Sequence, residues 1–162
     1  MKIILNEDSV HQGKNGAITG EIYFSANDRF FPEENWSDFV ATILGWWINS
    51  YANAKSNGQP LELCFMDGPY SILGNLIDNN VYKLVFIRHD NTVSNPLFTA
   101  NVSEEDLRKM LLSACRKFFK IAAKENMDQK AFEGLRKLFF RLKEMEPANR
   151  KRHPSFIFGE VP

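Results

Sequence analysis

The sequence predicts an α+β domain in which helices pack on an antiparallel meander sheet. Strand-like segments follow one another with short polar turns between them, and amphipathic helical segments occur in separate blocks. The expected order is ββ-α-βββ(β)-αα, which lacks the regular strand–helix alternation of a parallel sheet. We assign residues 1–147 to one domain and residues 148–162 to a basic C-terminal tail.

Length and composition are those of an ordinary globular protein. The chain has 162 residues, 44% hydrophobic and 25% charged, so it can bury a core without disulfides or metals. Cys64 and Cys115 lie in apolar stretches and are expected to be buried free thiols, which indicates a reducing compartment. The apolar runs at 3–5 and 39–48 are too short for a signal peptide or a membrane span, so we expect a cytoplasmic protein.

The two parts of the chain differ in charge although the whole is neutral. Residues 1–102 contain 6 Lys+Arg and 11 Asp+Glu, a net charge of −5, and residues 103–162 have a net charge of +5. Such asymmetry can mark separate binding faces. The simpler interpretation is that long surface helices carry lysine and arginine as solvated side chains.

Two strands are expected at the N-terminus, at residues 2–6 and 17–25, where apolar and polar side chains alternate. The segment 13–16 between them contains glycine and asparagine, which tolerate positive φ, so the strands are expected to form a hairpin with a long loop. Residues 27–35 are expected to form a loop with two adjacent aromatic residues.

An amphipathic helix is expected next, with Asn35 as its N-cap and Asp38 three residues later as in a capping box. Apolar side chains recur at three- and four-residue spacing: Trp36, Phe39, Val40, Ile43, Leu44, Trp47 and Tyr51. Gly58 is a stop signal for this helix. The adjacent Trp46 and Trp47 widen its apolar face, which we attribute to core packing.

Three strands with tight turns follow at residues 61–66, 70–77 and 81–88, a spacing that predicts an antiparallel meander. The third is apolar at nearly every position, so it is expected to be central and covered on much of both faces. Residues 97–102 are expected to add an edge strand, because the preceding proline cannot donate a ladder hydrogen bond.

The last third is expected to be helical. Ser103 is the N-cap of a first helix, residues 125–127 break it, and Asp128 caps a second helix. Pro147 stops that helix. Residues 155–158 could dock as a short strand.

No pattern of catalytic or ligand-binding residues stands out. His11, His89 and His153 fall in unrelated segments, and no cysteine has a nearby partner, so no metal or cofactor is expected. His89 beside Asp90 is the only suggestive pair, but neighbours on a strand point to opposite faces. We therefore expect a protein that is not an enzyme.

The basic C-terminal region raises nucleic-acid binding as an alternative. Its cations are Lys130, Arg136, Lys137, Arg141 and Lys143, followed by Arg150, Lys151 and Arg152. Glu133, Glu144 and Glu146 are interspersed among them, so a solvated helix face is the favoured interpretation.

Residues 31–40, Phe-Pro-Glu-Glu-Asn-Trp-Ser-Asp-Phe-Val, lead into a helix that carries Trp46-Trp47 and is followed by the meander and a C-terminal helix. In this organisation residues 18–120 resemble small bacterial immunity proteins of polymorphic-toxin and contact-dependent growth-inhibition systems. The resemblance implies a compact, cytoplasmic, non-catalytic protein that holds a cognate toxin in an inactive complex. The neutral charge departs from the acidic character common among inhibitors of nucleases, which puts a nuclease toxin in doubt.

We therefore expect a protein-binding inhibitor that occludes its partner, with complementary charge speeding the encounter. The expected contacts are loop aromatics, which protein interfaces favour, and acidic residues of loops and turns: Phe30, Phe31, Glu33, Glu34, Asp67, Asp78 and Asp90. The alternatives are a nucleic-acid-associated protein, an enzyme without a recognisable motif, and a homodimer formed through surplus apolar surface.

Overall fold

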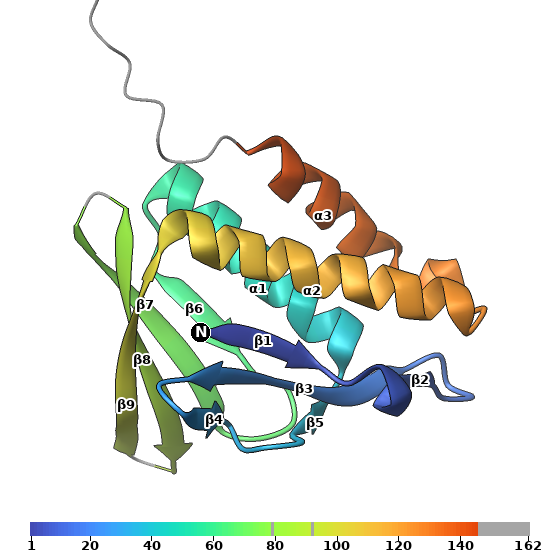
Figure 1. Cartoon of the computed structure of the whole chain (residues 1–162), viewed down its shortest axis with the longest axis horizontal. Coiled ribbons are helices and arrows are strands. Elements are labelled where there is room, and N and C mark those ends of the chain that lie inside the picture. The colour runs from blue at the N-terminus through green and yellow to red at the C-terminus, as the bar shows by residue number, and fades with distance from the viewer. Residues whose placement is uncertain (79, 92, 146–162) are drawn as a thin grey trace, which may run out of the picture.

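A computed structural model describes residues 1–78, 80–91 and 93–145 of the chain (Figure 1). It contains two antiparallel sheets with three helices gathered on one side of them, so the predicted α+β class is confirmed. None of the helices in these ranges is long and apolar enough to cross a membrane.

The N-terminal sheet is organised around β3 (Ile18–Ala26), which pairs with four other strands. They are β1 (Lys2–Leu5), β2 (His11–Gln12), β4 (Arg29–Phe31) and β5 (Ser37–Asp38). The expected antiparallel pairing of the first two strands is confirmed by the register of β1 with β3. A short 3-10 helix, Glu7–Ser9, lies in the loop between them.

The β3–β4 hairpin was expected to be an open loop. Asn27 and Asp28 both have positive φ, 51° and 58°, which is the conformation that a two-residue type I′ turn requires. Asparagine and aspartate are among the few residues that accept it. The Asn-Asp pair was therefore a usable hairpin signal.

Helix α1 (Val40–Asn57) begins later than predicted, and the predicted N-cap at Asn35 is wrong. Asn35 has a φ of 61°, and the carbonyl of Trp36 accepts a hydrogen bond from the Ile22 amide at 2.8 Å, which holds this segment extended against β3. The predicted stop is confirmed, because Gly58 adopts the left-handed conformation at the C-cap.

The predicted meander is confirmed as β6 (Leu61–Cys64), β7 (Tyr70–Asp78), β8 (Val81–Asp90) and β9 (Val93–Ser103) in that spatial order. The edge strand β9 is longer than expected. On the face of β8 that packs on the core, Tyr82, Leu84 and Phe86 are buried. On the other face Ile87 is buried, Val85 is partly covered and Lys83 is exposed. The outer face of β8 is therefore less completely buried than the sequence predicted.

The C-terminal helices are α2 (Glu104–Lys124) and α3 (Glu133–Glu144), with a 3-10 turn at Gln129–Phe132 between them. Both predicted caps are confirmed: the Ser103 hydroxyl accepts from the Asp106 amide at 3.0 Å, and the Asp128 carboxylate accepts from the Lys130 amide at 3.0 Å. Pro147, the basic tail and the strand expected at 155–158 lie outside the described residues.

Helix α1 lies at the centre of the molecule, in contact with β3, β6, α2 and α3. Its Trp47 and Tyr51 are fully buried, but the adjacent Trp46 is exposed, so the expectation that both tryptophans serve the core is wrong for Trp46. A cluster of aromatic rings joins α1 to both sheets. It comprises Phe24, Phe31, Trp47, Phe65 and Phe86.

Candidate functional site: a surface of two interlocked loops

The residues before α1 and the residues between β6 and β7 lie against each other at one end of the molecule (Figure 1). We call residues 30–36 and 65–70 together the loop surface. It includes five of the seven residues that the sequence identified as partner contacts, and one of the five, Phe31, belongs to the aromatic core beneath the surface. Its geometry depends on one buried carboxylate and two aromatic rings.

The buried carboxylate is that of Asp38, which is 1% exposed. Its Oδ1 accepts from the Phe39 amide at 2.7 Å, and its Oδ2 accepts from the Trp36 indole at 3.3 Å. The same Oδ2 also accepts from the backbone amides of Met66 and Asp67 at 3.1 and 3.2 Å. One side chain thus fixes both loops. Without this carboxylate its donors would lose their hydrogen-bond acceptor in a poorly solvated position, which would cost free energy.

The Trp36 ring also holds the two loops together, through contacts with Tyr70 and Gly68. It packs edge-to-face on Tyr70, with ring centroids 5.2 Å apart, and its Cη2 lies 2.9 Å from where a Cβ on Gly68 would be. Gly68 has a φ of 131°, which side chains rarely adopt, so both space and backbone conformation require glycine here. The next residue, Pro69, accepts a hydrogen bond from the His89 amide at 2.7 Å, which ties the loop to β8.

The two adjacent phenylalanines have opposite environments, because neighbouring strand residues face opposite sides. Phe31 is 1% exposed and packs edge-to-face on Phe65 and Phe86, so its expected role as a surface contact is wrong in this conformation. Phe30 is 42% exposed and rests on the Tyr23 ring at a centroid distance of 5.6 Å. Of the two phenylalanines, only Phe30 therefore remains a candidate surface contact.

The acidic candidates fall at two ends of the molecule. Glu33, Glu34 and Asp67 are exposed on the loop surface. Asp90 lies beside it, at the end of β8 next to the residue that binds Pro69, and accepts hydrogen bonds from Arg88 and Asn95. Asp78 lies at the opposite end of β7, about 26 Å away along the strand, and does not belong to this surface.

Sequence reasoning missed Met66, which is 47% exposed within the loop surface. Its position at the end of an alternating strand suggested a role in the sheet, but β6 already ends at Cys64. The signal that could have found it is the following Asp-Gly-Pro sequence, which marks a turn and so indicates that the strand ends close to Met66.

The ring nitrogens of His11 and His89 contact hydroxyl groups. His89 Nε2 lies 2.8 Å from the buried Ser71 Oγ, and His89 Nδ1 lies 3.0 Å from Ser94 Oγ, which connects β7, β8 and β9. His11 Nε2 lies 3.2 Å from Thr19 Oγ1. Within the ranges that the structure describes, no three His, Cys, Asp or Glu side chains are close enough to hold a metal ion.

A second buried acidic group connects the helices. Glu104, at the start of α2, accepts from the Tyr51 hydroxyl at 3.2 Å and forms an ion pair with Lys55. Burial, and to a smaller extent the nearby Glu104, raise the pKa of Tyr51 well above its usual range. This group is structural, because it fastens α1 to the first turn of α2.

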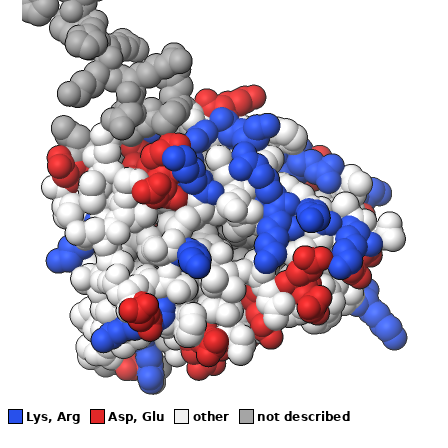
Figure 2. Space-filling model, viewed as in Figure 1, with Lys and Arg blue, Asp and Glu red and all other residues white. Residues whose placement is uncertain are grey.

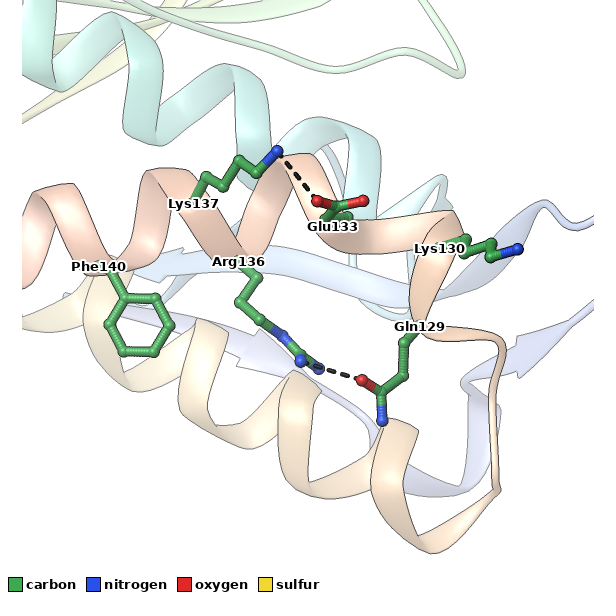
Figure 3. Close-up of a pocket in the computed structure, with 6 residues that line it drawn as sticks. All are labelled: Gln129, Lys130, Glu133, Arg136, Lys137 and Phe140. Atoms are coloured by element: carbon green, nitrogen blue, oxygen red, sulfur yellow. Dashed lines mark hydrogen bonds and ion pairs between the residues drawn. The ribbon is translucent and has the colours of Figure 1, made fainter.

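The outer side of α3 carries a shallow hollow of about 440 Å³ (Figure 3). Its lining is formed by Gln129, Lys130, Glu133, Arg136, Lys137 and Phe140. The Arg136 guanidinium lies over the rings of Phe119 and Phe132 and donates to Gln129 at 3.0 Å, while Lys137 pairs with Glu133 at 3.0 Å. The Phe140 ring is 52% exposed.

Next to this hollow, lysine and arginine side chains gather over α2 and α3 (Figure 2). Those on the exposed side of α2 are Lys109, Arg116, Lys117, Lys120 and Lys124. The Lys124 ammonium lies 2.9 Å from Glu7, and its hydrogen bond and charge, with smaller contributions from Lys120 and Lys117, lower the pKa of that carboxyl. We call these five residues, together with Arg136 and Lys143 of α3, the basic face.

Comparison of the chain with protein-family models, with curated proteins and with solved structures finds no match.

Proposed function

We propose that this chain is a cytoplasmic immunity protein that neutralises a cognate protein toxin by binding it through the loop surface. The observation that carries the proposal is the pair of loops fixed by Asp38, which display Phe30 and Met66 among Glu33, Glu34 and Asp67. The resemblance of residues 18–120 to immunity proteins points in the same direction.

The composition of the loop surface suits a protein partner. An exposed aromatic ring and a methionine supply apolar contact area, and residues of these types are enriched at protein interfaces. The carboxylates around them favour a partner that presents lysine or arginine, since complementary charge speeds the encounter and excludes wrong partners. A toxin whose active site or essential surface is basic would be occluded by this arrangement.

The fixation of the loops matters for affinity. A loop that must become ordered on binding loses conformational entropy at that moment, and a loop already held in place does not. The Asp38 hydrogen bonds and the Trp36–Tyr70 packing hold both loops before any partner arrives. This supports tight, slowly dissociating binding, which an inhibitor of a toxin requires.

Co-expression with the product of the neighbouring gene, which the proposal expects to contain a toxin domain, tests the proposal. The unmodified chain is expected to restore growth of a bacterial host and to co-purify with the toxin. The variant Glu33→Lys/Glu34→Lys is expected to lose both. The control Glu125→Lys/Glu144→Lys makes the same charge change at exposed positions at the ends of α2 and α3, away from the loops, and is expected to retain both. The proposal fails if the toxin binds both variants equally well, or if the chain does not bind it.

A further inference from the structure

We propose that the basic face and the α3 hollow beside it bind single-stranded nucleic acid. Cations of α2 would contact successive phosphates, and the exposed Phe140 ring would stack on a base. This surface lies on the helices and is separate from the loop surface, so the inference stands or falls independently of a toxin partner.

The cations of α2 form one continuous row. Between Leu107 and Lys124 the helix has six basic residues and no acidic one. Of the five on its exposed side, Arg116 and Lys117 are adjacent and the others follow at three-, four- or seven-residue spacing, which places all five on one broad face over about 22 Å of helix. At about 3.4 Å per phosphate along a stacked strand, this length spans roughly six phosphates.

The centre of the row forms no ion pair in the described part of the chain, although Lys117 and Lys120 lie near enough to Glu7 to help lower the pKa of its carboxyl. Lys109 at one end pairs with Glu105 at 3.6 Å, and Lys124 at the other pairs with Glu7 at 2.9 Å. Arg116, Lys117 and Lys120 between them have no ion pair within the described part of the chain. Unpaired, solvated cations are those that release counterions when they meet phosphates.

Helix α3 continues the face and adds an aromatic platform. Arg136 lies 5.9 Å from the centroid of the Phe119 ring, so it bridges from α3 to α2 one turn from Arg116. Lys143 lies 5.9 Å from the centroid of Phe140, at the side of the hollow of about 440 Å³. An exposed ring among cations is the arrangement on which single-stranded binding proteins stack bases, whatever the sequence.

Other anionic partners fit less well. A lipid surface would need several large apolar side chains beside the cations to enter the membrane interface, and the exposed side of α2 carries only Asp106 in its first turn, its cations, Ser113 and Ala123. An acidic peptide would use the charges but not the ring of Phe140. Of the glutamates that favoured a solvated face in the sequence, Glu133 lies in the α3 hollow, where it pairs with Lys137, whereas α2 has no acidic residue after its first turn.

Fluorescence anisotropy with a labelled 12-nucleotide oligouridylate, titrated with the full chain at several salt concentrations, tests the inference. Binding is expected at low salt, with an affinity that falls steeply as salt rises. In Lys117→Gln/Lys120→Gln the slope of log K against log salt is expected to be shallower by about 1.4, because two phosphate contacts are lost. The control Lys14→Gln/Lys83→Gln removes the same charge from exposed sites off the helices and is expected to leave the slope unchanged.

A second variant separates stacking from charge. Phe140→Ala is expected to weaken oligouridylate binding about 5- to 100-fold at constant salt slope, because it removes a stacking ring and no charge. The inference is overturned if oligouridylate does not bind at low salt or if the two lysine pairs have equal effects. It is also overturned if polyglutamate or a duplex of the same length binds as tightly as oligouridylate.

Discussion

The Oδ2 atom of Asp38 lies 3.1 Å from the backbone nitrogen of Met66, 28 residues later in the chain. This hydrogen bond and its neighbour to Asp67 join the segment before α1 to the turn after β6. These hydrogen bonds join the two loops into one surface.

Replacement of the carboxylate should loosen the junction. In Asp38→Asn one oxygen becomes an NH₂ group that faces backbone donors, so we expect a loss of about 2–3 kcal/mol in the free energy of unfolding. Urea denaturation measures it. The matched change Asp28→Asn, at an exposed turn position that asparagine also accepts, should stay within about 0.5 kcal/mol. Equal stability of the two variants would show that the buried carboxylate does not fix the loops.

The turn beneath Trp36 should not tolerate a side chain. In Gly68→Ala the new Cβ would meet the Trp36 ring at 2.9 Å with an unfavourable φ of 131°, so we expect a loss of about 1–3 kcal/mol. Gly134→Ala is the opposite control, because this helical glycine has open space around it and should be stabilised by about 0.5–1 kcal/mol. Thermal unfolding of both variants checks the pair, and a neutral Gly68→Ala would contradict the tight junction.

The buried tyrosine of α1 should make the protein sensitive to alkali. The pKa of Tyr51 is raised by burial and by Glu104, so the folded state keeps its proton after the unfolded chain loses it near pH 10. Its contribution to stability is therefore complete below pH 10 and declines above it, by about 1.4 kcal/mol per pH unit. Tyr51→Phe should lose about 1 kcal/mol at pH 7 through the missing hydrogen bond and show a shallower decline above pH 10. Parallel curves for the two proteins in urea titrations would contradict this assignment.

Both thiols should react slowly in the folded protein. Burial raises the pKa of Cys64 to about 11 and that of Cys115 to about 12, with Glu62 adding to the effect at Cys64. With a disulfide reagent at pH 8 we expect slow labelling that rises about tenfold per pH unit, and fast labelling of two thiols in denaturant. A rate that levels off near pH 8.5 would contradict the raised pKa values.

Secondary structure was predicted best from the sequence where no tertiary contact opposed the local preference of the residues. Ser103 and Asp128 cap the helical segments that follow them, and Gly58 ends α1, because short-range chemistry alone decides those positions. The meander likewise follows from alternation and turn residues.

Prediction failed where tertiary partners competed with local preference. Asn35 and Asp38 have the spacing of a helix start. Instead, the Trp36 carbonyl accepts a hydrogen bond from β3, and the Asp38 carboxylate accepts hydrogen bonds from the amides of the distant β6–β7 turn. The exposure of Trp46 has the same origin, since the positions of α3 and β6 around α1 decide which side chains of this helix are covered. The sequence therefore identified most residues of the loop surface but did not predict the contacts that bring its two segments together.

Hydrogen–deuterium exchange on the complex with the protein encoded beside its gene tests the proposed binding mode most directly. Binding through the loop surface should slow exchange at residues 30–36 and 65–70 relative to the free chain, and leave the outer side of α1 around Trp46 unchanged. Protection confined to that side of α1, or to the helices of the basic face, would contradict it.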